Sequence, residues 1–239
     1  MFQHGYLEQA AASFRQVIAE KPDNAEAYYN LGTLYLRQNQ FQEARRYLEQ
    51  TVKLRSNYPE AWNNLGMAAA QEGQTDEAVR NFRESLRLRP DYAVALLNLG
   101  NIYRRQGTVG EAEKLLTRAL EVEPENPEVN YSLGMLYGQQ DKIPRALEFF
   151  DKALSVRPDY PDALNNLGVV LVHERRFSEA EQKFKACIDA APKFDQAYLN
   201  LARLYVLLNE KDKAQTVLQT LLRGQPQHKL AQQMLETLH

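Results

Sequence analysis

The sequence repeats with a period of 34 residues. Six units follow one another without insertion or deletion, at 25–58, 59–92, 93–126, 127–160, 161–194 and 195–228. Every unit has leucine at position 7, alanine at position 20, and leucine or phenylalanine at position 24. Position 8 is glycine in the first five units and alanine in the last. Such a period predicts an array in which each unit packs only on its neighbours.

The spacing of apolar residues predicts two helices in each unit. Apolar residues at positions 4, 7, 8 and 11, and again at 20, 24, 27 and 28, follow the helical period. All ten prolines lie at the junctions between these segments, because a proline inside a helix costs about 3 kcal/mol. The small residues at positions 8 and 20 are expected where two helices approach closely, and the residue at position 24 is expected to fill the space between them.

Position 4 also predicts packing. Trp62 holds this position in the second unit and is expected to be a packing residue. In the fourth unit Asn130 stands in its place, and Tyr131 is expected to substitute in part for the missing apolar side chain.

The stretch Trp62-x-x-Leu65-Gly66, with Ala78, Phe82 and Pro90 after it, resembles the tetratricopeptide repeat. The resemblance implies an all-α fold, a right-handed superhelical solenoid of antiparallel helix pairs that forms a single domain over 1–239. Residues 1–24 are predicted to be the second helix of a partial repeat, and 229–239 a C-terminal capping helix. We expect the start to be a cut through a longer array, with a natively truncated start as the alternative.

Composition narrows the possible partners and locations. The 239 residues carry 29 basic and 31 acidic side chains, a net charge of −2, which gives no reason to expect nucleic acid. No apolar run has the length that crosses a bilayer, so membrane insertion is not expected. The lack of a signal-peptide pattern and the single cysteine, Cys187, favour a cytoplasmic location.

Position 6 suggests a function. It carries asparagine in five of the six units, with Ser132 in the fourth. A carboxamide offers an acceptor oxygen and a donor NH2, which match the two polar groups of a peptide bond. The family resemblance implies that first helices line a concave groove, so these side chains, expected to be exposed, could hold the backbone of an extended peptide. The rungs of this ladder are Asn30, Asn64, Asn98, Asn166 and Asn200.

The pattern is similar to the asparagine ladders of O-linked N-acetylglucosamine transferases and kinesin light chains. The alternative is that asparagine at position 6 is only a tolerated polar residue on a solvated helix face. Further candidate contacts lie around the rungs, where aromatic and methionine side chains suit apolar groups and cationic ones suit acidic groups. These candidates are Tyr29, Arg37, Met67, Asn101, Arg105, Tyr131 and His173, together with Met135 and Val169.

Nothing in the sequence supports catalysis. The four histidines, His4, His173, His228 and His239, fall at unrelated repeat positions, and no metal-ligand spacing is present. Cys187 is interpreted as a small packed residue. We therefore predict a non-enzymatic interaction scaffold without cofactor or metal, whose partner is a protein or an extended peptide segment.

Two alternatives remain open at this point. The first is a substrate-recruiting arm of a larger enzyme, such as a glycosyltransferase. The second is a self-assembling array, joined through an exposed apolar surface of Tyr6, Leu7, Phe14 and Val17 on the uncapped N-terminal helix.

Overall fold

The computed structural model describes residues 2–238, with side chains from residue 7 onward. Over this range the chain is helical and contains no β-strand, so the all-α prediction is confirmed. The side chains of His4, Tyr6 and His239 lie outside the described residues. The helices are α1 (Phe2–Glu20), α2 (Ala25–Arg37), α3 (Phe41–Leu54), α4 (Pro59–Gln71), α5 (Thr75–Leu88), α6 (Ala93–Arg105), α7 (Val109–Val122), α8 (Pro127–Gln139), α9 (Ile143–Val156), α10 (Pro161–His173), α11 (Phe177–Ala190), α12 (Asp195–Leu207), α13 (Lys211–Gly224) and α14 (Lys229–Glu236).

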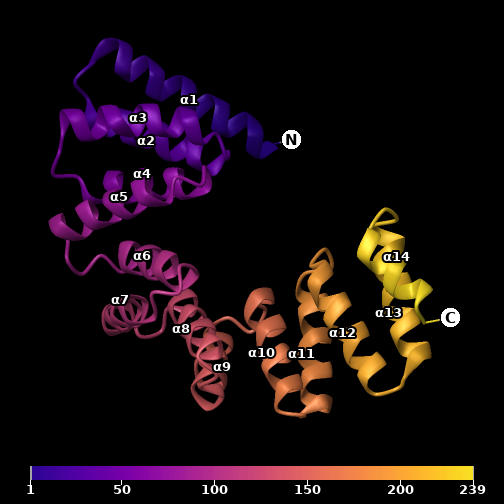
Figure 1. Cartoon of the computed structure of the whole chain (residues 1–239). Helices are drawn as coiled ribbons and strands as arrows, with labels where there is room; N and C mark the ends of the chain where they lie inside the picture. The colour runs from indigo at the N-terminus through magenta and orange to yellow at the C-terminus, as the bar shows by residue number, and fades with distance from the viewer. Residues whose placement is uncertain (1, 239) are drawn as a thin grey trace. The chain divides into compact units, whose positions relative to one another are not determined.

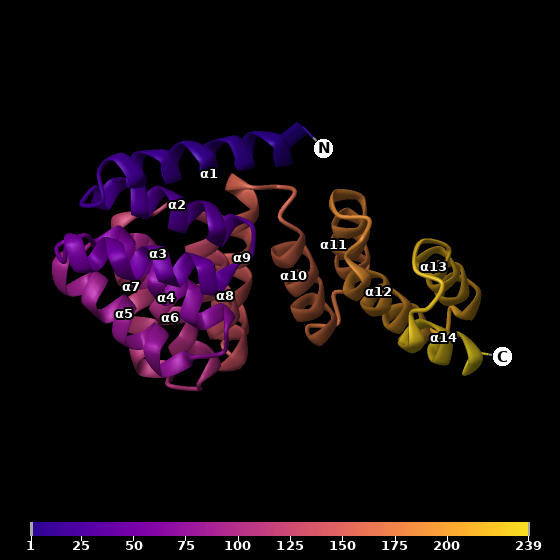
Figure 2. The same ribbon diagram turned by 90° about the horizontal axis from the view of Figure 1, so that it is seen from above.

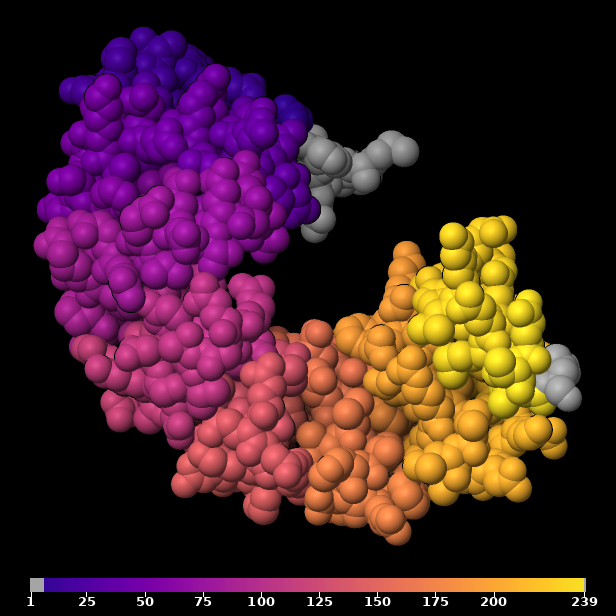
Figure 3. Space-filling view, in the orientation of Figure 1, coloured from indigo at the N-terminus to yellow at the C-terminus, as the bar shows by residue number. Residues whose placement is uncertain are grey.

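The chain divides into two compact units. The first is Met1–Pro124, with α1 to α7, and the second is Glu125–His239, with α8 to α14. Each is described by itself below, and the assignment of the whole chain to one domain stays a prediction. Figure 3 shows the first unit in indigo to magenta and the second in pink to yellow, and within each the atoms of consecutive repeats touch.

Each predicted repeat consists of two neighbouring helices joined by a short turn. In the first unit α2 packs on α3, α4 on α5 and α6 on α7. In the second unit α8 packs on α9, α10 on α11 and α12 on α13, and α14 packs on α13. Figures 1 and 2 show α10 beside α11 in both views. The even-numbered helices from α2 to α12 are called first helices here, and their odd-numbered partners second helices.

In five of the six helix pairs the glycine at position 8 lies where the two helices approach closely. A Cβ added to Gly168 would lie 2.5 Å from Cε1 of Phe184, and one added to Gly66 would lie 2.7 Å from the ring of Phe82. Both phenylalanines occupy position 24 and are almost completely buried. The position-20 alanines of all six repeats are fully buried as well. The expected packing of positions 8, 20 and 24 is confirmed.

Every first helix is followed, two residues after its end, by a residue with left-handed backbone. This residue is position 15 of the repeat, with φ between 56° and 75° in all six repeats. After α2, the N–H of Asn39 donates to Leu36 O and the N–H of Gln40 donates to Tyr35 O, which closes the helix end. Glycine fills the position twice, as Gly73 and Gly107, whereas Arg175 adopts the same conformation with a full side chain.

The N-terminal helix differs from its prediction. Leu7 and Phe14 were expected to be exposed, but they are half-buried and pack against the core of the first unit. The reason is that α2 covers this side of α1. Val17 is half-buried as well. Self-association of the chain stays a prediction.

Position 4 behaves as expected. Trp62 packs against the same core, while its Nε1 donates to Ser56 O at 2.8 Å. In the fourth repeat Asn130 is buried, and its Nδ2 donates to Asn126 O at 2.9 Å. The ring of Tyr131 lies 5.9 Å from that of Phe150, at position 24, and so takes part of the place of the missing apolar side chain.

Candidate binding faces of the first helices

The predicted site residues lie on first helices of both units. Those of the first unit come from α2, α4 and α6, and those of the second come from α8, α10 and α12. We call these two surfaces the first face and the second face. The first face carries Tyr29, Asn30, Arg37, Asn64, Met67, Asn98, Asn101 and Arg105, and the second carries Tyr131, Met135, Asn166, Val169, His173 and Asn200.

The ladder asparagines are less exposed than predicted. Asn64 is only 9% exposed, and Asn30, Asn98, Asn166 and Asn200 are half-buried. The expectation of freely exposed carboxamides is therefore wrong. Neighbouring first helices pack closely enough to bring position 6 of one repeat against the helix of the repeat before it.

In the first face the carboxamide NH2 groups donate across the repeat boundary. Nδ2 of Asn98 donates to Oδ1 of Asn63 at 3.1 Å. Nδ2 of Asn64 donates to Oγ1 of Thr33 at 3.0 Å, and its oxygen accepts from Nδ2 of Asn63 at 3.3 Å. These bonds connect α6 to α4 and α4 to α2, so they help to hold successive first helices together.

The second face repeats this arrangement. Nδ2 of Asn200 donates to Oδ1 of Asn165 at 2.9 Å. Nδ2 of Asn166 donates to the hydroxyl of Tyr131 at 3.1 Å and to the backbone oxygen of Asp162 at 2.8 Å. In three of these contacts the donor at position 6 and the acceptor at position 5 are separated by 35 residues, one repeat plus one.

These contacts correct the ladder hypothesis. A carboxamide was expected to present both its donor and its acceptor to a peptide, but the donor side of four rungs is engaged within the protein. Over the described residues, the oxygens of Asn98 and Asn166 accept no hydrogen bond, and Asn30 makes none with either end of its carboxamide. The carboxamide groups that remain without a hydrogen-bond partner on these faces are therefore mainly acceptor oxygens.

The two candidate tyrosines also contact other aromatic rings. The ring of Tyr29 stacks on Tyr58, with 4.7 Å between the centroids. The ring of Tyr131 lies 5.2 Å from that of Tyr160. Burial, and then the nearby carboxylate of Asp162, raise the pKa of the Tyr160 hydroxyl. Tyr29 and Tyr131 thus pack against the last residue of their own repeats, and both are half-buried.

The remaining candidates of the first face are polar or cationic, apart from Met67. Arg37 and Arg105 are exposed and make no ion pair with any described residue. Asn101 is half-buried and accepts from Nε of Arg104 at 3.3 Å, and Met67 is exposed. His173, on the second face, is exposed, with Nδ1 3.4 Å from Oε1 of Glu174.

The second face carries an apolar surface that the sequence reasoning found only in part. Val169 is 44% exposed, and Val206 and Leu207 on α12 are 45% and 60% exposed. Val169 borders two hollows, of about 270 Å³ and about 210 Å³. Val206 and Leu207 were not among the predicted residues. They hold positions 12 and 13 of the last repeat, where the third repeat has Arg104 and Arg105. This change from arginine to apolar residues was a signal that the sequence carried.

The described residues give no metal centre. They contain no group of three or more histidine, cysteine or acidic side chains placed to hold a metal ion. None of the helices combines the length and the apolar character needed to cross a bilayer. Cys187 is buried, its Sγ donates to Pro161 O at 3.2 Å, and burial raises its pKa to about 11.

Comparison with solved structures shows which proteins share this fold. The chain is similar to a protein in the structure of the anaphase-promoting complex hetero-tetramer Cut9–Hcn1, with a TM-score of 0.86 and 19% identity over 98% of this chain. It spans only 46% of the length of that protein. PilF of Pseudomonas aeruginosa matches with a TM-score of 0.76 and 23% identity, covering 89% of this chain and 97% of PilF.

A third similar structure is YrrB, described as a TPR protein with an unusual peptide-binding site. Its TM-score is 0.59 and its identity 23%, over 78% of this chain and 96% of YrrB. At these identities the likeness shows the fold alone.

Sequence comparison gives the family. No curated protein sequence matches the chain. Models of the tetratricopeptide repeat match residues 29–93 and 131–193, and also 69–136 and 171–238, and a further TPR repeat model matches 1–39. With matches over most of its length and the helix pairs described above, the chain belongs to the tetratricopeptide repeat family.

Proposed function

We propose that this protein binds an extended segment of a partner protein along the second face, without catalysing a reaction. The tetratricopeptide repeat fold is in general a protein-interaction scaffold. The observation that carries the finer proposal is the pair of exposed apolar side chains Val169 and Leu207, which lie on two adjacent first helices and line the same hollow. Contiguous exposed apolar surface on a folded protein marks an interaction site, because leaving it in water is unfavourable.

The polar groups beside this surface suit a peptide in extended conformation. Oδ1 of Asn166 accepts no hydrogen bond from the described residues and therefore suits a backbone N–H. His173 and Arg203 are exposed on the same helices and suit acidic or carbonyl groups. The similarity to YrrB, whose description names a peptide-binding site, is consistent with a peptide as the ligand class.

The first face is proposed as a secondary, more polar contact surface. Its exposed Arg37 and Arg105 lie without ion-pair partners over the described residues, and the acceptor oxygen of Asn98 is available. It would bind polar or acidic parts of the partner, whereas the second face would bind apolar parts.

The test is selection of random linear peptides displayed on phage against the full chain, followed by affinity measurements on Val169→Glu and Val156→Glu. Val169 and Val156 lie in the same unit and are 44% and 48% exposed, but Val156 ends a second helix, away from the proposed surface. We expect Val169→Glu to weaken selected peptides about tenfold or more and Val156→Glu to leave binding unchanged. Failure to select any peptide, or equal binding by both variants, would refute the proposal.

A further inference from the structure

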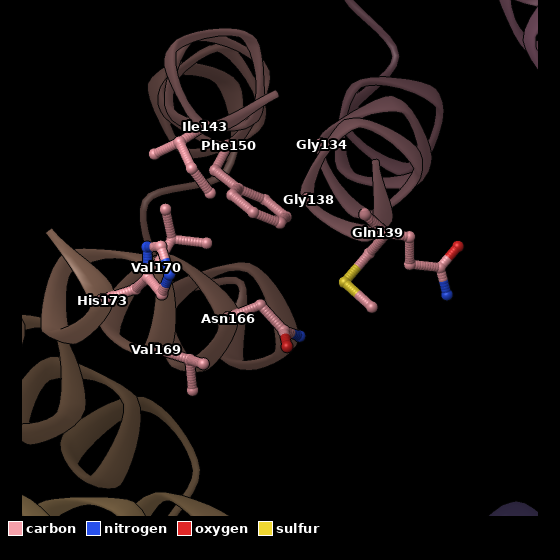
Figure 4. A pocket seen from close by; sticks show the side chains of 10 residues that line it. Gly134, Gly138, Gln139, Ile143, Phe150, Asn166, Val169, Val170 and His173 are labelled. Atoms are coloured by element: carbon pink, nitrogen blue, oxygen red, sulfur yellow. The ribbon is translucent and has the colours of Figure 1, made fainter. Parts of the chain in front are cut away.

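The larger hollow in the second face lies between α8, α9 and α10. Its walls include Gly134 and Gly138 from α8, Ile143 and Phe150 from α9, and Asn166 and Val169 from α10. Figure 4 shows the two glycines on one side, Asn166 and Val169 on the other, and Ile143 and Phe150 on the α9 side. We infer that this hollow is an anchor pocket for one large, uncharged apolar side chain of the bound segment, an inference that rests on the proposed function.

Gly138 is the first argument for a binding role. It lies in the last turn of α8, one residue before the helix ends at Gln139, and it is not among the residues whose left-handed φ favours glycine. Packing does not require it, since a Cβ added there would meet only Cβ of Ala146, at an ordinary 3.9 Å. Gly134, one turn earlier, differs, because its added Cβ would lie 2.8 Å from the ring of Phe150. The absence of a side chain at Gly138 opens the hollow instead of relieving a clash.

Size is the second argument. A cavity of about 150 Å³ in a protein core holds benzene, and pockets for drug-sized ligands begin near 300 Å³. At about 270 Å³ the hollow has room for a leucine, methionine or phenylalanine side chain and is small for a complete organic ligand. The occupant it fits is a single large side chain.

Charge is the third argument. His173 is the one ionisable group among the ten residues that line the hollow, and it lies beside Glu174 at its exposed edge. A lysine or arginine side chain placed in the hollow would meet no carboxylate among the lining residues, and an acidic side chain would meet only His173, at the exposed edge, so a charged group gains little there in exchange for lost hydration. The lining therefore selects against charged residues and in favour of apolar ones.

Asn166 gives the bound segment a direction. Both N–H groups of its carboxamide are engaged, with the Tyr131 hydroxyl and the Asp162 carbonyl, so the oxygen alone is left for a ligand. Asn166 is one of the residues that line the hollow, and in the proposed complex its oxygen accepts a backbone N–H of the segment close to the anchored residue. An apolar side chain with a peptide N–H beside it fits both the apolar hollow and the acceptor oxygen of Asn166.

The experiment begins with the peptides selected on the full chain in the phage display above. We expect them to share leucine, methionine, isoleucine or phenylalanine at one position. One such peptide is then made with that residue changed to alanine, and both peptides are titrated against wild type and Gly138→Leu. Gly138→Ala serves as a milder filling variant, and circular dichroism checks that each variant is folded.

The matched control is Ala70→Leu. Ala70 holds position 12 of the second repeat, as Gly138 does in the fourth, and lies outside the hollow. We expect Gly138→Leu to weaken the selected peptide about tenfold or more, Gly138→Ala to weaken it less, and Ala70→Leu to leave it unchanged. On Gly138→Leu, removing the anchor side chain from the peptide should cost nothing further.

The outcomes separate the two proposals. Selected peptides that share no apolar position, or an anchor effect of equal size in wild type and Gly138→Leu, would overturn the anchor pocket and leave the proposed function in place. Failure to select any peptide would overturn both. A wild-type dimer that Gly138→Leu converts into a monomer would place a second copy of the chain in the hollow and overturn the assignment to a peptide.

Discussion

The carboxamide of Asn98 donates a hydrogen bond to the carboxamide oxygen of Asn63, one repeat earlier, at 3.1 Å. Asn63 is almost completely buried, so its oxygen has no access to water as a replacement donor. The same relationship connects Asn200 to Asn165 at 2.9 Å. The asparagines at position 6 therefore contribute to the connection between repeats, whatever else they bind.

Removing this donor should destabilise the first unit. We expect Asn98→Ala to lower the free energy of unfolding by about 1–3 kcal/mol, the cost of leaving a buried acceptor unsatisfied. The control is Asn30→Ala, because Asn30 holds the same repeat position and makes no hydrogen bond with described residues; its effect should stay within about 0.5 kcal/mol. Urea unfolding followed by circular dichroism measures both.

A double-mutant cycle isolates the pair. Asn63→Ala and Asn98→Ala together should cost less than the sum of the single changes, with a coupling energy of about 1 kcal/mol. Additive effects would mean that the Asn98–Asn63 hydrogen bond does not contribute to stability.

Two glycines of the second unit should respond to alanine in opposite directions. Gly168→Ala places a Cβ 2.5 Å from Cε1 of the buried Phe184 and should destabilise by about 1–3 kcal/mol through overpacking. Gly138→Ala meets no close contact and should stabilise α8 by at most about 0.5–1 kcal/mol, the value for the middle of a helix, because Gly138 lies in the last turn. Thermal unfolding of the two variants and of wild type measures both changes in stability. A loss of stability in Gly138→Ala would contradict the argument that packing does not require this glycine.

Arg175 should be improved by glycine. Its φ of 57° lies in the left-handed region, which costs an ordinary residue about 1–2 kcal/mol. We expect Arg175→Gly to raise the urea midpoint, with a stabilisation of about 1 kcal/mol. Asn209→Gly, at the same repeat position with a φ of 59°, should gain less, because asparagine tolerates this conformation better. Equal midpoints for wild type and Arg175→Gly would show that the conformation carries no strain.

The thiol of Cys187 should react slowly in the folded protein. Burial raises its pKa to about 11, so at pH 8 almost none of it is thiolate, and the side chain has no access to solvent. Labelling with a chromogenic disulfide reagent at pH 8 should become fast only when denaturant unfolds the second unit. Rapid labelling under native conditions would contradict the burial.

The raised pKa also predicts a loss of stability at high pH. The unfolded thiol ionises near its ordinary pKa, whereas the folded thiol stays neutral until about pH 11. Because the unfolded state releases its proton first, wild type should lose stability relative to Cys187→Ala as the pH rises from 8 to about 10.5. Alanine is a suitable replacement, since Ala119 and Ala153 fill the same repeat position.

The packing of the repeat was readable from the sequence because it depends on residue size at fixed positions. Gly66 and Phe82, or Gly168 and Phe184, are complementary in volume, and their periodic recurrence indicates that they meet. The left-handed residue that follows each first helix was not found. Five of the six residues at this position are asparagine, glycine or aspartate, the types that adopt this conformation most readily, so the sequence carried a readable signal, with Arg175 as the exception.

The role of the asparagines was only half predictable. Their recurrence at position 6 was evident, but their partners were not, because the acceptor changes from Asn63 to Tyr131 to Asn165 along the chain. Hydrogen bonding between repeats depends on the distance and orientation of two helices, which a single sequence does not provide. The hollow at Gly138 was missed for a similar reason, since an empty volume is a property of three helices together.

The donor at position 6 and the acceptor at position 5 also limit how the repeats can be arranged. Exchanging the second repeat, 59–92, with the third, 93–126, would leave every helix length and every turn unchanged. In the exchanged chain the repeat that contains Leu97 would come directly before the repeat of Asn64, and Leu97 has no polar side chain to accept a hydrogen bond. The exchange would also separate Asn98 from its acceptor, Asn63. Repeats of equal length are therefore not interchangeable, because a few amide groups make hydrogen bonds that depend on which repeat comes before. Chains with the repeats in another order should be less stable than the natural chain.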